Sequence, residues 1–412
     1  MTLPVLPLRR LFQVVNGGTP TSDATNWGGD VPWGGDVPWA TPADFSGRLT
    51  EVVTTRRTLT QSGARSGSVV VPRGSLLVST RAPIGYVCIT GTEMAFNQGC
   101  RALVPEAAVD VRFFGYQLEA RRLDLQADGL GTTFLELSSE RLSSFKVVAP
   151  SLDEQRRIAD FLKAETGRID RLIHLYDRLS GLAAERAQRV LDEAVESCPH
   201  QVPLRYIVRF REGPGIMAAD FRDDGVPLIR IAGLKKGEVT LNGCNFLDRE
   251  RVAHQWSQFR LRLGDRLISG SATMGGVSVV RNPAVVDSIP YTGLIILRPA
   301  QKNVEMEYVE AFLRSSHFMR QIHLLKTGAT MQHFGPTHLS QVHAPLPSPA
   351  DQRTIAMIAK EAVRHASLCE EQTKRQIALL EERRQALITA AVTGQLDVST
   401  ASGRNVTEGV SA

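Results

Sequence analysis

Two long stretches of the chain place apolar residues at the spacing of paired helices. The first stretch runs from Ile158 through Leu162, Glu165, Ile169, Leu172, Tyr176, Leu179, Ala183, Arg186 and Val190. The second keeps the same alternating steps through Ala359, Ala362, Ala366, Cys369, Thr373, Gln376, Leu380, Arg383 and Leu387. This heptad pattern predicts two coiled-coil helices. The small residues that open the second stretch favour close antiparallel packing against the first.

The ends of the first helix can be placed from residue types. Asp153 stands where an N-cap belongs, just before the periodic run, with Arg156 in place of the Glu of a capping box. Pro199 cannot continue a helix, so the segment is expected to end at "CPH".

The sequence outside these stretches predicts short strands. Runs such as "GSLLVST", "GYVCIT", "VPLIRIA", "DRLISG" and "GLIILRP" are apolar, often β-branched, and bounded by glycine or proline. Helices are expected near Phe113 to Gln126 and Met306 to Leu325. The predicted class is α+β, with two strand-rich α/β domains joined by two long antiparallel helices.

An internal repeat relates the two halves of the chain. Gly131 to Ala159 aligns without gaps with Gly328 to Ala356 at an offset of 197 residues, and Gly74 to Val87 matches Gly264 to Val277 at an offset of 190. Growing offsets indicate two copies of one scaffold with different loops. The predicted segments are a first globular domain, its helix, a second globular domain, its helix and a tail, at residues 1–150, 151–198, 199–347, 348–398 and 399–412.

Composition adds only broad limits. Apolar residues make up 42% and charged residues 22% of the 412 positions, as in ordinary globular proteins. The formal charge of +5 suits a polyanionic partner but does not require one. The five scattered cysteines form no C-x-x-C pair, and no signal segment or membrane span is evident, so we expect a cytoplasmic protein with reduced thiols.

Six segments of the chain resemble one known family. They are "GGTPTS" from Gly17, "VPWATPADF" from Val37, "RAPIG" from Arg81, "NQGCRALVP" from Asn97, "PSLDEQRRIADFL" from Pro150 and "LITAAVTGQLDV" from Leu387. In this order they resemble the specificity subunit of a Type I DNA restriction-modification system over nearly the whole chain. Departures are the tandem "WGGDVPWGGDVPW" at 27–39, Ser271 at the position that matches Arg81, and Asp351 at the position that matches Glu154.

The resemblance implies a function in DNA recognition. Two target recognition domains would each read half of a split double-stranded target in the major groove, and the helices would separate them and dock two methyltransferase subunits. S-adenosylmethionine, Mg²⁺ and ATP are expected on the methyltransferase and motor-nuclease (restriction) subunits, and no cofactor on this chain. At about 1.5 Å per residue, helices of some 40 residues would form a rod of about 60 Å.

The chain lacks the motifs of an independent enzyme. "NPAV" at Asn282 lacks the second proline and the aromatic residue of a methyltransferase tetrapeptide, and no G-x-x-x-x-G-K-[ST] phosphate loop occurs. We therefore expect a non-catalytic subunit of a complex that methylates adenine and cleaves DNA.

Basic and glycine-rich positions are candidates for DNA contact, because arginine can bind guanine bidentately, lysine and arginine neutralise phosphates, and Gly-Thr loops offer N–H and hydroxyl donors. In the first half they are Arg56, Arg57, Arg65, Arg73, Arg81, Thr132 and Thr133. In the second half they are Lys235, Lys236, Arg260, Arg262, Arg266, Lys326 and Thr330. Solvated surface charge and glycine-containing turns are the alternative interpretations.

Other conspicuous residues have structural alternatives. The helix starts offer methyltransferase-docking candidates, which are Glu154, Gln155, Arg156, Asp351, Gln352 and Arg353. The same residues suit helix initiation, where acids favour the positive end of the dipole. Trp27, Trp33 and Trp39 are expected to pack their own loop rather than wedge into DNA. The histidines between His317 and His365 do not have metal-ligand spacing.

Two further functions stay open at this point. One is a coiled-coil scaffold that organises proteins without reading DNA, and the other is a separated target-reading part of a related restriction enzyme. Salt-dependent DNA binding would distinguish the first of these from a DNA reader.

Overall fold

The computed structural model describes residues 3–28, 37–129, 136–235, 237–270, 276–325 and 334–398. The chain divides into two compact units, which we describe separately. Unit 1 comprises residues 1–175 and 375–412, and unit 2 comprises residues 176–374. Each unit therefore contains one globular part and half of each long helix.

Unit 1 is built on two mixed sheets. The large sheet has the order β2 (Phe12–Asn16), β11 (Cys100–Pro105), β8 (Leu76–Ser79), β9 (Val87–Thr90) and β5 (Thr50–Val52). The small sheet has the order β3 (Trp27–Gly28), β6 (Thr58–Leu59), β4 (Val37–Ala40), β10 (Met94–Phe96) and β7 (Val70–Val71). Helix α2 (Val111–Ala120) buries Phe113 and Phe114 in a core shared with the large sheet.

Unit 2 repeats this plan with a large and a small sheet. The large sheet has the order β14 (Val208–Glu212), β23 (Leu294–Pro299), β20 (Arg266–Ser269), β21 (Val277–Val279), β18 (Glu238–Val239) and β17 (Leu234–Lys235). The small sheet has the order β15 (Phe221–Arg222), β19 (Asn245–Leu247), β16 (Val226–Ile229) and β22 (Ile289–Pro290). Strand-rich globular parts of the α+β class are thus confirmed in both units.

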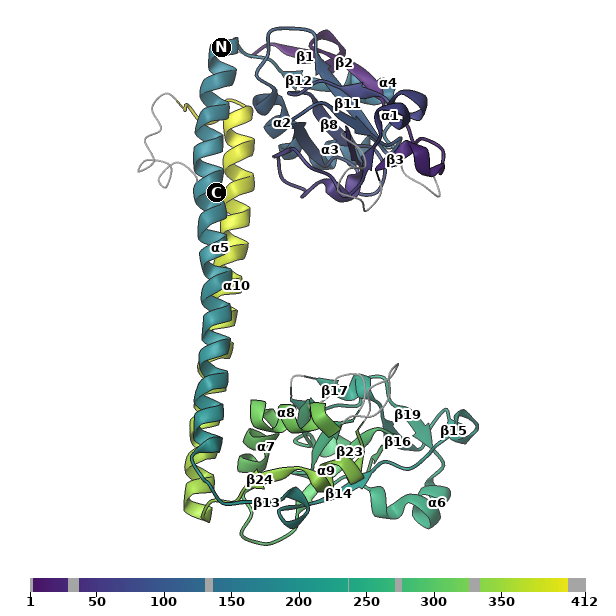
Figure 1. The fold of residues 1–412 in the computed structure, drawn as a ribbon, viewed down its shortest axis with the longest axis vertical. Helices are drawn as coiled ribbons and strands as arrows, with labels where there is room; N and C mark the ends of the chain where they lie inside the picture. The colour runs from purple at the N-terminus through teal and green to yellow at the C-terminus, as the bar shows by residue number, and fades with distance from the viewer. Residues whose placement is uncertain are drawn as a thin grey trace. The chain divides into compact units, whose positions relative to one another are not determined.

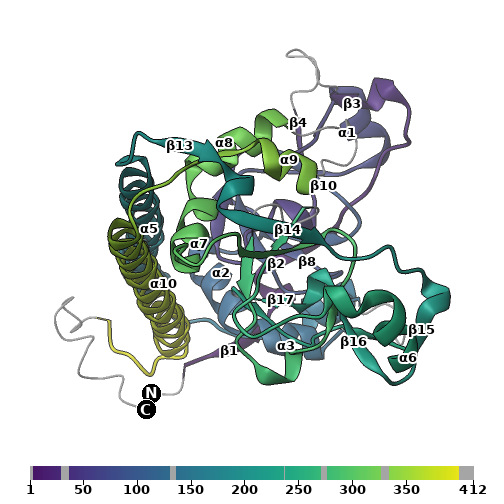
Figure 2. The same cartoon turned by 90° about the horizontal axis from the view of Figure 1, so that it is seen from below.

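The predicted globular helices are confirmed as two helix pairs. In unit 1, α2 is followed by α3 (Arg122–Ala127). In unit 2, α7 (Met306–Arg314) is followed by α8 (Ser316–Leu325). Helix α7 lies beside the long helix α10, and the two share a buried core that includes Ala311 and Ala359 (Figure 2).

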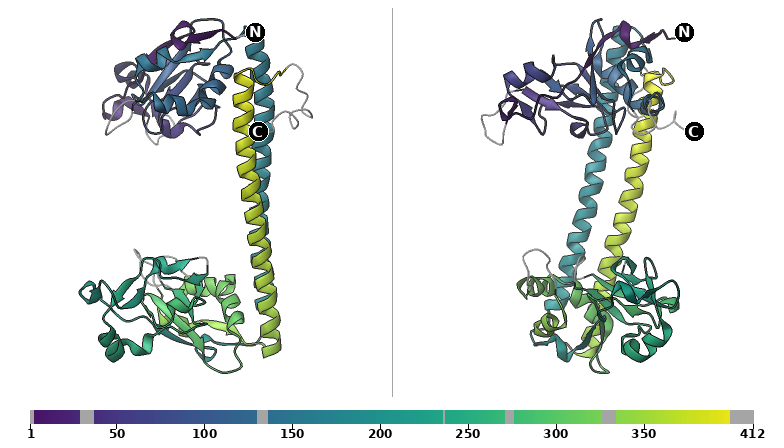
Figure 3. Two further views of the ribbon diagram at one scale, coloured as in Figure 1. Left: turned by 180° about the vertical axis from the view of Figure 1, so that it is seen from behind. Right: turned by 90° about the vertical axis from the view of Figure 1, so that its right-hand side faces the viewer.

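Both long helices are present as continuous elements, α5 (Leu152–Glu196) and α10 (Pro349–Val392), and they run side by side within each unit (Figures 1 and 3). The predicted cap at Asp153 is wrong. Helix α5 already begins at Leu152, and the hydroxyl of Ser151 accepts from the Glu154 N–H at 3.4 Å. Ser348 caps α10 in the same way, accepting from the Asp351 N–H at 3.3 Å. In the part of the chain that the structure describes, no helix combines the length and apolar character needed to cross a bilayer.

The buried face of α5 differs from the predicted heptad positions. Ile173 is buried where Leu172 was predicted, and Ser180 and Ala187 are less exposed than Leu179 and Arg186. Small residues such as Ser180 and Ala187 permit closer approach of two helices than large side chains do. A row of leucines consequently lies on the exposed side of α5, namely Leu172, Leu175, Leu179 and Leu182.

The helices are also part of the globular cores. Ile158 and Leu162 of α5 belong to the main core of unit 1 together with Leu387 of α10. Leu191 of α5 and Ile355 of α10 belong to that of unit 2. The predicted segments 151–198 and 348–398 treated the helices as separate spacers, but their apolar faces complete the domain cores.

A buried glutamine links each helix start to the globular part that precedes it. The Gln155 side chain accepts from the Asp110 N–H at 3.0 Å and donates to the Pro150 carbonyl at 2.8 Å. Gln352 repeats this arrangement, accepting from the Glu305 N–H at 2.9 Å and donating to the Pro347 carbonyl at 3.0 Å. The same pair of bonds in both copies shows that the repeat extends to side-chain detail.

We expect Gln155→Leu and Gln352→Leu each to lower the free energy of unfolding by about 1–3 kcal/mol, because each leaves a half-buried N–H and a buried carbonyl unpaired. Gln372→Leu, on an exposed position of α10, is the matched control. Urea unfolding followed by circular dichroism measures the difference. Equal unfolding midpoints for all three variants would contradict a structural role for these glutamines.

Candidate nucleic-acid interface

Two arginines and one glutamate lie together beside the start of β11 in unit 1. The guanidinium of Arg101 is 3.3 Å from Glu136, and its Nε donates to the Ser139 hydroxyl at 2.8 Å. Arg81, whose side chain is 51% exposed, lies 3.2 Å from the other oxygen of Glu136. Backbone hydrogen bonds hold the three segments of this cluster together. The Thr80 N–H donates to the Gly99 carbonyl, and the Thr80 carbonyl accepts from the Leu137 N–H.

This arrangement leaves one positive charge uncompensated next to exposed polar groups, which suits an anionic ligand. Arg81 was predicted as a DNA-contacting residue, and its exposure keeps that prediction open. Arg101 was not predicted as a site residue. Its role depends on Glu136, which lies far away in the sequence, so no local signal marks it.

The other predicted DNA-contacting residues of unit 1 are separated from this cluster. Arg56 is exposed and donates its backbone N–H to Asp44 at 2.9 Å. Arg65 is exposed in the last turn of α1 (Gln61–Gly67). Arg73 lies 3.4 Å from Glu51 in an exposed ion pair, which holds it only weakly. Thr132 and Thr133 lie outside the described residues.

Arg57 lies over the tryptophans of the small sheet. Its guanidinium carbon is 3.6 Å from the ring centre of Trp27 and 5.5 Å from that of Trp39. The two indoles meet edge to face at 4.9 Å, and Trp39 is buried. The expectation that Trp27 and Trp39 pack within their own domain is therefore confirmed, whereas Trp33 lies outside the described residues.

The predicted residues of unit 2 differ in exposure. Lys235 on β17 is exposed, as is Arg262 in the turn before β20. Arg260 is half-buried and donates to the Asp287 carbonyl at 3.3 Å. Lys236, Lys326 and Thr330 lie outside the described residues.

Arg266 is a structural residue rather than a DNA-contacting one. Its side chain is only 9% exposed, lies 2.6 Å from Glu307 of α7 and donates to the Gly264 carbonyl at 2.8 Å. The ion pair connects the large sheet to α7. A ligand would have to break this ion pair to reach the guanidinium. The structure therefore contradicts the predicted DNA contact of Arg266.

The family comparison gives this geometry a context. Residues 5–173 match the type I restriction modification DNA specificity domain. The type I restriction enzyme MjaIX specificity subunit of Methanocaldococcus jannaschii is 30% identical over 163 residues, which cover 38% of this chain and 36% of that protein. The EcoBI specificity subunit of Escherichia coli is 22% identical over 326 residues, covering 72% of this chain and 68% of that subunit. In sequence, the chain is similar to type I specificity subunits.

Two solved structures share the fold over nearly the whole chain. A chain from a study of complex assembly and conformational transition in a type I restriction-modification system has a TM-score of 0.75 and 17% identity, covering 96% of this chain and 100% of that one. The HsdS subunit of Thermoanaerobacter tengcongensis has a TM-score of 0.56 and 18% identity, covering 95% and 97%. The chain thus shares its fold with these two solved structures.

The candidate docking residues at the helix starts have mixed surroundings. Gln155 and Gln352 are 4% and 1% exposed and bonded inside the chain, so they are not available to a partner. Glu154 is half-buried beside the Ser151 cap. The exposed candidates are Arg156, which pairs with Asp153 at 3.8 Å, Asp351, and Arg353, which pairs with Glu305 at 2.8 Å.

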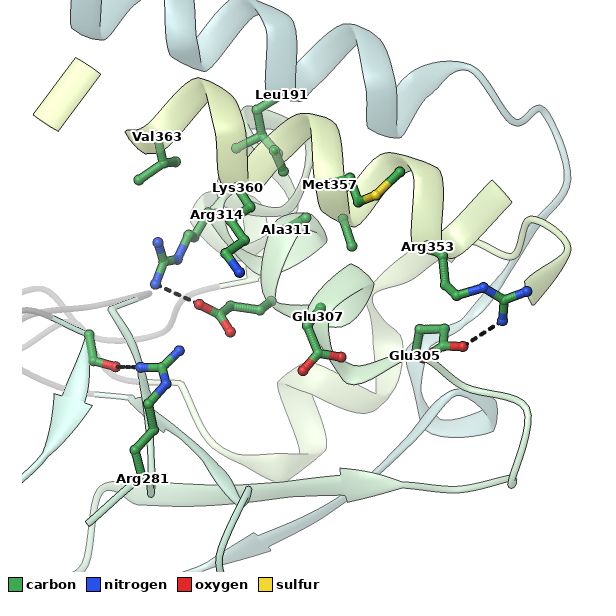
Figure 4. Close-up of a pocket in the computed structure, with 14 residues that line it drawn as sticks. Leu191, Arg281, Glu305, Glu307, Ala311, Arg314, Arg353, Met357, Lys360 and Val363 are labelled. Carbon is green, nitrogen blue, oxygen red and sulfur yellow. Dashed lines mark hydrogen bonds and ion pairs between the residues drawn. The ribbon is translucent and has the colours of Figure 1, made fainter. Parts of the chain in front are cut away.

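A polar groove lies between α7 and α10 in unit 2 (Figure 4). Its charged side chains are largely paired with one another, Arg353 with Glu305 and Arg314 with Glu310 at 2.8 Å each. Over the described ranges, no group of three or more His, Cys, Asp or Glu residues could hold a metal ion. We therefore interpret the groove as part of the contact between the globular part of unit 2 and α10.

Proposed function

We propose that this specificity subunit reads a bipartite double-stranded DNA target, one half-site with each globular part, for a type I restriction-modification complex. The observation that supports this most directly is the duplication. One scaffold occurs twice with the same strand register and the same buried glutamine, while the exposed basic residues differ between the copies. Two similar domains with different surfaces suit two different half-sites.

The chain would act without catalysing a reaction itself. The relatives are named as specificity subunits, and DNA methylation and cleavage would be carried out by the methyltransferase and restriction subunits. We place S-adenosylmethionine, Mg²⁺ and ATP on those partners. Adenine methylation of the target is then the measurable product of the complex.

We further propose that methyltransferase subunits dock on the exposed apolar face of the long helices. In unit 2 this face forms an open groove between α5 and α10, the apolar groove, lined by Leu179 and Leu182 of α5 and Met357 and Ile358 of α10. All four side chains are at least 40% exposed. An amphipathic helix of a partner could bury these side chains by packing between the two helices.

Mapping methyladenine across the host genome, with and without this gene, tests the DNA-reading role. We expect methylation at one bipartite motif to disappear completely when the gene is deleted and to return when it is restored on a plasmid. A host that shows the same methylated motifs in all three strains, while it expresses the partner methyltransferase, would contradict the proposal.

A scaffold without DNA readout makes a different prediction for DNA binding. Phosphate contacts release counterions, so the affinity of the purified chain with its methyltransferase should fall steeply as salt rises. A flat salt dependence would favour the scaffold.

A further inference from the structure

The small sheets of the two units can be aligned residue by residue from their strand register. Val37 pairs with Leu59 in unit 1 as Val226 pairs with Leu247 in unit 2. The parallel pairs Ala40 with Phe96 and Ile229 with Pro290 also correspond. Counting outward from these pairs, three positions of unit 1 correspond to three of unit 2: Thr41 to Arg230, Arg57 to Asn245, and Asn97 to Tyr291.

Each small sheet lays one arginine over aromatic rings, but from a different position. In unit 1 Arg57 lies over Trp27 and Trp39, as described above. In unit 2 the guanidinium carbon of Arg230 is 4.4 Å from the ring centre of Tyr291 and 6.0 Å from that of Phe221. Trp27 and Phe221 are equivalent, since they pair with Leu59 and Leu247. Both units thus have an aromatic residue at the position of Trp27 and Phe221, but the arginine that covers it comes from a different position in each sheet.

These two arginines differ from Arg249 and Arg251 in their partners. Arg251 and Arg249 near the small sheet of unit 2 pair with Asp220 and Asp224. For Arg57 and Arg230, the described parts of the chain provide no carboxylate within ion-pair distance. An aromatic face orients the guanidinium without neutralising its charge.

The guanidinium of Arg230 is oriented by a hydrogen bond and an aromatic ring, and some of its N–H donors stay available to a ligand. Its Nη1 donates to the Asn245 side-chain oxygen at 2.9 Å, and Asn245 is the residue equivalent to Arg57. A guanidinium has five N–H donors, so the single bond to Asn245 leaves donors that a ligand can use. A planar donor pair of fixed orientation matches the O6 and N7 acceptors of guanine in the major groove.

We propose that Arg57 and Arg230 are sequence-discriminating residues, each requiring a guanine in the half-site read by its unit. This inference rests on the proposed DNA-reading function. A phosphate contact would need only charge and could use the same position in both copies. Domains that read different half-sites must instead differ at the positions that contact bases. All three of the corresponding positions defined above differ between the two units.

The test uses the full chain with its methyltransferase in a host that lacks adenine methylation. Methyladenine mapping is carried out for Arg57→Ala, Arg57→Lys, Arg230→Ala and Arg230→Lys. Arg222→Ala is the control, because Arg222 is exposed on β15 and donates to the backbone carbonyls of Ala219 and Phe221. We expect each alanine variant to accept other bases at one guanine position of one half-site, while the other half-site stays unchanged.

Discrimination at that position should fall by about tenfold to a hundredfold, the effect of one bidentate base contact. The lysine variants should relax the same position, since lysine keeps the charge but not the planar donor pair. Methylation of targets in which the other half-site is unchanged shows that the variant chain is folded and assembled with its methyltransferase. An unchanged motif in the alanine variants, or wild-type discrimination in the lysine variants, overturns the inference. If the wild-type complex methylates no bipartite motif, the proposed function itself fails.

Discussion

Replacing Arg384 by alanine should destabilise unit 1 by about 3–5 kcal/mol, the cost of removing one partner from a buried ion pair. The Arg384 side chain is 5% exposed and lies 3.6 Å from Glu119, which is equally buried, and 3.1 Å from Asp170 of α5. Glu119 also accepts from the Leu49 N–H at 2.7 Å. Without Arg384 the Glu119 carboxylate remains buried, and among the described residues no other cation lies within ion-pair distance of it.

The cluster explains why the loss should be large. Arg48 from the globular part reaches both long helices, lying 2.7 Å from Asp170 and in contact with Glu381. Together these residues connect α2, α5, α10 and the loop that precedes β5. Arg364→Ala, which removes an exposed pair with Glu361 on α10, is the control and should leave the unfolding midpoint unchanged.

The penalty should also depend on pH. Burial raises the pKa of Glu119, an effect that the charge of Arg384 partly offsets. The folded state therefore binds a proton more readily than the unfolded state, so the stability from this carboxyl is greatest below its unfolded pKa and falls as pH rises through its folded pKa. Removing Arg384 raises that folded pKa further. Urea unfolding of Arg384→Ala should accordingly show a smaller loss at pH 5 than at pH 8.

A second substitution separates charge from packing. Glu119→Gln in the Arg384→Ala background removes the unpaired charge and keeps an oxygen for the Leu49 N–H, so the double variant should be more stable than Arg384→Ala alone at pH 8. If the double variant is no more stable, and the loss is the same at both pH values, the effect comes from lost packing and the ion cluster is not its cause.

The large features of this fold follow from local patterns. Helical periodicity predicted α5 and α10, and gapless self-similarity predicted two copies of one scaffold. The face of α5 that packs inward was harder to predict. Leucines at 172 and 179 have the stronger apolar signal, but the inward positions are filled by Ile173 and by small residues, because the distance between helices depends on both partners.

Residue roles depended on contacts that are remote in the sequence. Arg266 and Arg81 lie in similar strand-rich segments, yet Arg266 is buried against α7 and Arg81 is half exposed. Gln155 stands in a polar helix start and is buried because Asp110 offers its N–H there. The spacing of residues along the sequence does not predict these partners. Arg230 was not selected from the sequence for the same reason, since its aromatic partner Tyr291 follows β22 and is 61 residues away.

Leu179→Glu combined with Leu182→Glu should weaken binding of the methyltransferase subunit by more than about a hundredfold. The two side chains are 49% and 48% exposed on one face of α5 and line the apolar groove. Burying such leucines contributes on the order of 1 kcal/mol each, and burying an unpaired carboxylate in their place costs more. Because both positions are already exposed, the thermal melt of the variant chain alone should match the wild type.

Size-exclusion chromatography and calorimetry with the purified methyltransferase measure this loss. Leu123→Glu is the matched control, since Leu123 is 77% exposed on α3 and does not line the apolar groove, so an added charge there should leave binding unchanged. Wild-type affinity of the double variant would show that the apolar groove is not the docking surface. The exposed charges at the helix starts, Arg156, Asp351 and Arg353, would then be the next surface to test. An equal loss from Leu123→Glu would instead place a docking contact on the globular part.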